Sequence, residues 1–204
     1  MKQSEFSDST LRETRIESED LYDGVVVHLF KDTVRLPDGK TGAREYVRHI
    51  GAAAILPITK DGDALLVRQF RYPFDQVLLE IPAGKRNTFT EDPLLTAKRE
   101  LEEETGYRCE NLTFLGEYYS SPAILDERIW VYLATELEEG TQHPDDDEFL
   151  ELVRIPIERL VAMVEKNEIP DGKTQMAVLK AARILKISRK RYIFLWKERK
   201  QWRR

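Results

Sequence analysis

The sequence predicts an α+β protein, an α/β/α sandwich in which a mixed sheet lies between helices and follows a small antiparallel β module. Apolar or alternating segments typical of strands recur along the chain, and two segments near its C-terminal end have helical periodicity. Strands and helices do not alternate regularly, which favours a mixed sheet over a parallel one. With 204 residues, of which 41% are hydrophobic, the chain can bury one sizeable core.

Four parts are expected in order along the chain. Residues 1–20 are polar and are expected to form a flexible arm, and residues 21–49 a β module. Residues 50–186 are expected to form the main domain. Residues 187–204 are expected to be a basic C-terminal tail.

The β module is expected to contain three short strands around a tight turn. Alternating polar and apolar residues predict strands over Val25–Lys31 and Thr33–Leu36 and a return strand over Arg44–His49. Proline, aspartate and glycine in Pro37–Lys40 are typical of the turn between them.

The main domain begins with an apolar segment, Gly51–Thr59, that predicts a buried strand. The turn residues Asp61–Asp63 connect it to a partner strand over Ala64–Phe70. Further strands are expected over Val77–Ile81, Leu112–Tyr119, Ile129–Glu136 and Leu150–Ile155, and helices over Pro156–Lys166 and Lys173–Leu185.

A further helix is predicted over Pro93–Thr105. Asp92 is an N-cap residue, and proline is favourable at the first helical position because its missing N–H needs no partner there. Gly106 is expected to end the helix. The apolar residues at helical spacing are Leu94, Ala97 and Leu101.

Beside this apolar stripe, the same helix presents three glutamates, Glu100, Glu103 and Glu104. Residues three and four apart are neighbours on a helix. Each like-charged pair at this spacing lowers the stability of the helix by roughly a few tenths of a kcal/mol in solvent. A divalent cation removes this repulsion, and carboxylate oxygens are ligands that Mg²⁺ and Mn²⁺ take. Taken alone, such a triplet is more often a solvated face, so the alternative stays open.

The segment from Gly84 to Tyr107 resembles the Nudix box. The matching positions are Gly84, Glu91, Arg99, Glu100, Leu101, Glu103, Glu104, Gly106 and Tyr107. Six residues separate Gly84 from Glu91, where the family pattern has five. The resemblance implies a Nudix-type sandwich and a hydrolase that uses Mg²⁺, with Mn²⁺ as a substitute.

Matches between Leu21 and Leu179 resemble one branch of that family, the ADP-ribose pyrophosphatases and related nucleoside diphosphate sugar hydrolases. The segments that carry them include LPDGKTGAREYVRHIGAAAILP, VRQFRYPFDQVLLEIPAG, YYSSPAILDERIWVYLA and IPDGKTQMAVLKA. The resemblance implies hydrolysis of a pyrophosphate bond, giving a nucleoside monophosphate and a sugar phosphate. It also implies a homodimer, because the β module of that branch packs across a two-fold axis.

The same resemblance assigns roles to residues of this chain. It implies that Glu100, Glu103, Glu104, Glu148 and the carbonyl of Ala83 bind metal. It implies that Arg44, Arg71 and Glu127 bind substrate, and that Glu103, Glu148 and Arg99 serve catalysis, with Arg99 orienting the carboxylates. Asp146 is the alternative to Glu148. Strand alternation puts Arg68 and Arg71 on opposite faces, so only one of them is expected to reach a given site.

Two other functions stay open on the same motif. One is a nucleoside triphosphate or capped-RNA pyrophosphohydrolase, and the other is a non-catalytic domain that senses a ligand. The complete set of Glu100, Glu103 and Glu104 argues against loss of catalysis.

Charge is distributed unevenly. Residues 180–204 carry eleven Lys or Arg and one acid, which leaves a net charge of −15 on the rest of the chain. The negative body argues against a general nucleic-acid binder, whereas the tail is expected to pack on the body, lie on an acidic membrane surface or bind nucleic acid. The single cysteine, Cys109, and the lack of an apolar leader or a span of roughly 20 apolar residues favour a cytoplasmic protein.

Overall fold

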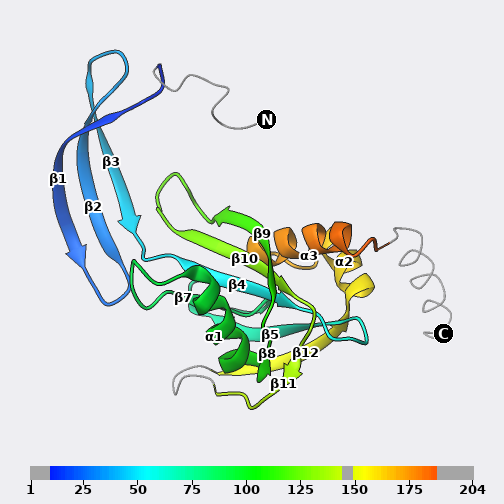
Figure 1. Ribbon diagram of the computed structural model, residues 1–204. Helices are drawn as coiled ribbons and strands as arrows, with labels where there is room; N and C mark the ends of the chain where they lie inside the picture. The colour runs from blue at the N-terminus through cyan, green and yellow to red at the C-terminus, as the bar shows by residue number, and fades with distance from the viewer. Residues whose placement is uncertain (1–9, 144–148, 188–204) are drawn as a thin grey trace. The chain divides into compact units, whose positions relative to one another are not determined.

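The computed structural model describes residues 10–143 and 149–187, which form two compact units (Figure 1). The N-terminal unit contains the described residues up to His49 together with Ser121–Glu127. The main unit contains Ile50–Ser120 and the described residues from Arg128 onward.

The N-terminal unit is built on a three-stranded antiparallel sheet in the order β1-β2-β3. Its strands are β1 (Thr14–Asp23), β2 (His28–Arg35) and β3 (Thr41–Arg48). The two strands expected over Val25–Lys31 and Thr33–Leu36 are wrong in one respect, because β2 runs continuously through Asp32. Asp32 pairs with Ser18 of β1 and with Arg44 of β3, so the ladder runs through this position, and its Oδ2 accepts a hydrogen bond from the Tyr46 hydroxyl at 3.3 Å.

Two expected boundaries differ from the structure. The sequence predicts an arm over residues 1–20, but Thr14–Asp20 of this range lies in strand β1. Every residue of β1 is exposed, so backbone pairing with β2 holds the strand and no apolar alternation marks it in the sequence. Ser121–Glu127 belongs to the N-terminal unit rather than to the main domain, because Val47 N–H donates to the Ile124 carbonyl at 2.8 Å.

The main unit contains a four-stranded sheet in the order β7-β4-β10-β9, and this sheet is mixed, as predicted. Strands β4 (Ala52–Pro57) and β10 (Arg128–Ala134) are parallel, and the other pairs are antiparallel. The outer strands are β7 (Ala83–Lys85) and β9 (Leu112–Tyr119). A second, antiparallel sheet has the order β12-β5-β6, with β12 (Leu150–Pro156), β5 (Asp63–Arg71) and β6 (Gln76–Glu80), and β8 (Tyr107–Arg108) pairs with β11 (Glu138–Glu139).

The helices of the main unit lie on both faces of the mixed sheet (Figure 1). They are α1 (Pro93–Thr105), α2 (Ile157–Glu165) and α3 (Gly172–Ile184). Alternate residues of β4 separate the two cores: Ala53 and Ile55 pack with α1, whereas Ala54 and Leu56 pack with α2 and α3. The predicted α/β/α sandwich is therefore confirmed.

Helix α1 has the predicted bounds. The Asp92 carboxylate accepts the N–H of Leu94 at 2.9 Å, which satisfies a helix N–H that has no partner within the helix. Gly106 has φ 74°, a left-handed conformation that costs glycine little, and its N–H donates to the Glu102 carbonyl at 2.8 Å. Ala97 and Leu101 are fully buried against the sheet.

The predicted tail, residues 187–204, lies outside the described residues except for Ile187. Among the described residues, no helix combines the length and the apolar character that a membrane crossing needs.

Candidate active site

The glutamates of α1 are not a solvated face. Glu100 is 6% exposed and Glu104 is 2% exposed, whereas Glu103 is half-buried. Because these residues lie beside the apolar stripe of Ala97 and Leu101, packing of α1 on the sheet carries their carboxylates inward. Burying a carboxylate costs free energy unless it is hydrogen-bonded or paired, so this arrangement calls for compensating partners.

Arg99 supplies part of the compensation. Its Nη1 lies 2.7 Å from Glu100 Oε1 and 2.7 Å from Glu103 Oε2, and its Nη2 donates to the Lys85 carbonyl at 2.9 Å. Burial acts to lower the pKa of Arg99, but the charges and hydrogen bonds of Glu100 and Glu103 raise the pKa above its ordinary value. Arg99 thus links two carboxylates of α1 to the backbone of β7.

The backbone of β7 lies directly against the buried carboxylates. The Ala83 N–H donates to Glu104 Oε2 at 3.2 Å. At Gly84, an added Cβ would lie 2.1 Å from Glu100 Oε1, a distance at which something must move. Any larger residue here would therefore displace the Glu100 carboxylate from its position beside β7.

These oxygens suit a hard divalent cation. Glu100 and Glu104 are buried carboxylates at one edge of α1, and carboxylate and carbonyl oxygens are the donor set that Mg²⁺ prefers. Within residues 10–143 and 149–187, no group of three or more His, Cys, Asp or Glu side chains has the geometry of a complete metal site. Glu103 is engaged by Arg99, and Glu148 and its alternative Asp146 lie outside the described residues.

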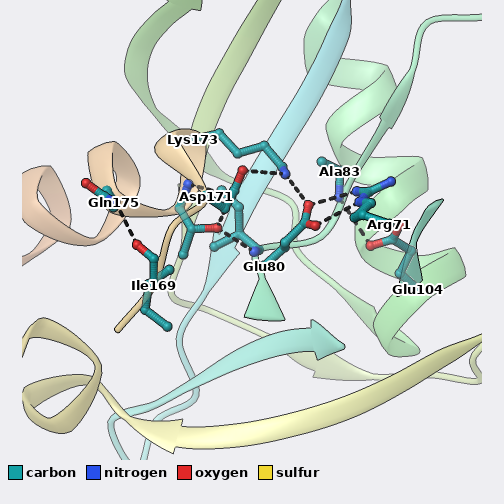
Figure 2. A network of polar contacts seen from close by, with 10 residues as sticks. Arg71, Glu80, Ala83, Glu104, Ile169, Asp171, Lys173 and Gln175 are labelled. Atoms are coloured by element: carbon teal, nitrogen blue, oxygen red, sulfur yellow. Dashed lines mark hydrogen bonds and ion pairs between the residues drawn. The ribbon is translucent and has the colours of Figure 1, made fainter. Parts of the chain in front are cut away.

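A second polar network lies next to the acidic edge of α1 (Figure 2). Arg71, the last residue of β5, donates from Nε and Nη2 to the two carboxylate oxygens of Glu80, both at 2.8 Å. Lys173 also donates to Glu80, and it contacts Asp171 at 3.1 Å. Asp171 caps α3 by accepting the N–H of Thr174 at 3.0 Å.

The network favours the charged forms of Glu80 and Arg71. Burial acts to raise the pKa of Glu80, but the Arg71 hydrogen bonds and the charge and hydrogen bond of Lys173 outweigh it and lower the pKa to about 2. The hydrogen bond to Glu80 raises the pKa of Arg71, and the charges of Asp171 and Glu104 act in the same direction. Figure 2 shows Arg71 next to Glu104 and Ala83.

The two arginines at the end of β5 have different partners. Arg68 pairs with Glu151, its cross-strand neighbour on β12, and both side chains are exposed. Only Arg71 lies by the acidic edge of α1.

The remaining expected substrate residues, Arg44 and Glu127, lie in the N-terminal unit. Arg44 donates from Nε to Glu13 at 2.8 Å, and this hydrogen bond raises its pKa. Glu127 Oε1 lies 3.5 Å from Nδ1 of His49.

The motif residue Glu91 faces its own loop. Its carboxylate accepts the backbone N–H of Asn87, and its carbonyl accepts from Arg86 Nε at 2.9 Å. The additional residue between Gly84 and Glu91 is therefore accommodated in a loop that closes on itself before α1 begins.

Sequence reasoning did not identify Glu80, Lys173 or Asp171 as members of the site. The available signals were weak: Glu80 is the one acid in the segment LLEIP, and Asp171 and Lys173 stand in DGKT before a helix. An aspartate there reads as an N-cap, which it is, but this pattern does not identify its partner on another strand.

Comparison with known proteins places the site in a family. Residues 47–177 match the model of the NUDIX domain, and residues 13–47 match the nucleoside diphosphate sugar hydrolase N-terminal domain. The chain belongs to the NUDIX family. The resemblance seen in the segment from Gly84 to Tyr107 is thereby confirmed.

Several curated relatives are similar over most of their length. An ADP-ribose pyrophosphatase of Bacillus subtilis (strain 168) is 42% identical over 171 residues, covering 83% of this chain and 92% of the relative. The methanol dehydrogenase activator of Bacillus methanolicus is 42% identical over 168 residues, covering 81% and 90%. A GDP-mannose pyrophosphatase of Yersinia enterocolitica is 36% identical over 141 residues, covering 64% and 72%.

Among solved structures, the crystal structure of an ADP compounds hydrolase superimposes with a TM-score of 0.76 at 22% identity. The match covers 88% of this chain and 97% of that one. At this identity the comparison supports the NUDIX fold rather than a particular substrate.

Proposed function

We propose that this NUDIX protein hydrolyses the pyrophosphate bond of ADP-ribose or a related nucleoside diphosphate sugar, giving a nucleoside monophosphate and a sugar phosphate. The observation that carries the proposal is the placement of Arg71 beside the buried carboxylates of Glu100 and Glu104. The names of the relatives, ADP-ribose pyrophosphatase and GDP-mannose pyrophosphatase, support this class of substrate.

The charges of the site suit this chemistry. A diphosphate is an anion and is repelled by carboxylates. It can bind beside buried acids only where cations lie between the two. Arg71 is a fixed guanidinium of the kind that binds phosphate oxygens with defined geometry. Glu100 and Glu104, with the Ala83 carbonyl, are proposed to hold Mg²⁺, which supplies charge neutralisation for the phosphates and a lower pKa for a bound water.

The residues around these ligands hold them in place. The Ala83 N–H fixes one oxygen of Glu104, and Arg99 bridges Glu100 and Glu103. Glu103 is proposed to complete the ligand set, and Glu148 to accept the proton of the attacking water, with Asp146 as the alternative. That water adds its oxygen to one phosphorus while the other phosphate leaves with the bridging oxygen.

Three further features are proposed. Mg²⁺ is the proposed metal, with Mn²⁺ as a substitute, and a homodimer is the proposed assembly, in which Arg44 and Glu127 contact substrate. The cytoplasm is the proposed compartment, supported by the single cysteine.

A substrate panel tests the proposal. The purified protein with Mg²⁺ is incubated with ADP-ribose, GDP-mannose, UDP-glucose, GTP and capped RNA, and the products are identified by chromatography. We expect the highest kcat/KM for a nucleoside diphosphate sugar. Preference for GTP or capped RNA would replace the proposal with the pyrophosphohydrolase alternative.

A second function, regulation of another enzyme, is favoured by one relative, which is a methanol dehydrogenase activator. Many dehydrogenases use a dinucleotide cofactor such as NAD, whose diphosphate has the same chemistry as that of ADP-ribose. NAD therefore belongs in the panel. Tight binding of one compound without turnover of any would favour a sensing or regulatory protein.

A further inference from the structure

Glu80 ends β6 as a buried carboxylate that binds two cations. It is 2% exposed, and its Oε1 accepts from Arg71 Nε. Its Oε2 accepts from both Arg71 Nη2 and Lys173 Nζ. The carboxylate therefore uses both oxygens to hold one guanidinium and one ammonium at the sheet edge next to α1.

The same network ties this sheet edge to α3. Lys173 contacts Asp171, and the N–H of Ile81, the residue after Glu80, donates to Thr174 Oγ1 at 2.9 Å. Glu80 is thus fixed both through its side chain and through the adjacent backbone. Removing the charge of Glu80 would leave the Arg71 guanidinium without the carboxylate that two of its nitrogens contact, whereas Lys173 would keep Asp171.

Arg71 is held on one side only. The pair with Glu80 uses Nε and Nη2, so Nη1 is not part of it, and 37% of the Arg71 side chain is exposed. An arginine that must be ordered when a ligand binds loses side-chain entropy at that step, whereas one fixed in advance has already lost it. A fixed guanidinium beside Glu104 is suited to meet a phosphate oxygen without rearrangement.

We propose that Glu80 and Lys173 are positioning residues, which hold Arg71 beside Glu104 and leave its Nη1 for a phosphate oxygen of the substrate. This inference rests on the proposed function, because it requires a diphosphate substrate at Arg71. Lys173 acts through Glu80 and does not itself contact substrate.

A double-mutant cycle on the full-length protein tests the inference. The variants are Glu80→Gln, Arg71→Ala and the double variant, with kcat and KM measured on the best substrate of the panel. Glu80→Gln keeps the side-chain shape but removes the charge, so we expect kcat/KM to fall about tenfold, mainly through KM. Arg71→Ala is expected to cause a larger loss, and the double variant to equal Arg71→Ala, since Glu80 acts through Arg71.

Glu151→Gln is the matched control, because it removes the carboxylate partner of Arg68, an exposed arginine on the same strand as Arg71. It is expected to leave kcat and KM unchanged. Lys173→Met is a second variant, which leaves the Glu80–Arg71 pair in place; it is expected to raise KM by a smaller factor than Glu80→Gln. Thermal unfolding of every variant reports the folded fraction, to which all rates are normalised.

Two results would overturn the inference while leaving the proposed function intact. One is an active wild type in which Glu80→Gln and Lys173→Met lower the unfolding temperature but leave kcat and KM unchanged. The other is a Glu80→Gln effect of equal size in the wild-type and Arg71→Ala backgrounds, which indicates a structural role independent of Arg71. A wild type that hydrolyses none of the panel would overturn the proposed function and the inference together.

Discussion

Two regions of the main unit carry the same chemical pairing, a glutamate beside an arginine, in different surroundings. At the inner edge of α1 and the end of β6, Glu100 pairs with Arg99 and Glu80 with Arg71, and both carboxylates are buried. On the outer surface, Glu151 pairs with Arg68, and its side chain is 64% exposed.

The difference shows that burial, rather than the type of pair, separates the two regions. Water screens exposed pairs, which contribute about 0–1 kcal/mol, whereas removing one member of a buried pair costs roughly 3–5 kcal/mol. The inner pairs are also linked to backbone groups of β7 and to Lys173, so their geometry is fixed. Substitutions in the two regions should therefore have different consequences.

The largest effect is expected at Glu104. Glu104→Gln keeps an oxygen for the Ala83 N–H but removes the negative charge that a divalent cation requires. We expect kcat with Mg²⁺ to fall by about two to three orders of magnitude with the fold retained, as is typical when transition-state electrostatics are removed. The check is steady-state kinetics together with circular dichroism.

The matched control for Glu104→Gln is Glu102→Gln, on the solvent side of the same helix, where the carboxylate pairs with Arg108. This control should keep wild-type kcat. Equal activity of the wild type and Glu104→Gln would refute the metal assignment.

The next effect is expected at Gly84. A methyl group there would overlap the Glu100 carboxylate, so either β7 or Glu100 must move. We expect Gly84→Ala to lower stability by about 1–3 kcal/mol and to lower kcat as well. The two quantities are measured by denaturant unfolding and by turnover.

Gly62→Ala is the control that separates general strain at a glycine from displacement of Glu100. Gly62 has φ +86°, and no atom lies within 4 Å of an added Cβ. That variant should lose stability through backbone strain without losing kcat. A Gly84→Ala variant with wild-type kcat would mean that the close approach of β7 to Glu100 has no functional consequence.

A pH dependence is expected from Glu80. Its folded pKa of about 2 lies below the ordinary value of 4.5, so its stabilisation is complete above pH 4.5 and is lost as the pH falls toward 2. Between pH 5.5 and pH 3 the loss amounts to about 2 kcal/mol. The difference in unfolding free energy between the wild type and Glu80→Gln should shrink by that amount, and a difference independent of pH would contradict the assignment.

The sequence predicted those features that depend on local signals. Asp92, Pro93 and Gly106 mark the ends of α1, and the apolar stripe of that helix determines that Glu100 and Glu104 lie at the buried edge. The resemblance to the Nudix box gave the family for the same reason, because its matched residues lie in one continuous segment.

The network around Glu80 could not be predicted in this way. Glu80 and Lys173 are separated by 93 positions and meet only because α3 packs on the sheet. No periodicity or spacing in one sequence records such a contact. Strand β1 was missed for a related reason, since its pairing uses backbone groups and its side chains are exposed.

The smallest effect is expected for the exposed pair between Arg68 of β5 and Glu151 of β12. Glu151→Gln removes a charge from Arg68, but water solvates both partners, so the free energy of unfolding should change by less than about 0.5 kcal/mol. High salt should change the stability of this variant little, because the Arg68–Glu151 attraction that salt would screen is absent from it. Denaturant unfolding at low and high salt measures both quantities. If Glu151→Gln lowered the free energy of unfolding as much as Glu80→Gln does, burial would not be what distinguishes the two arginine pairs.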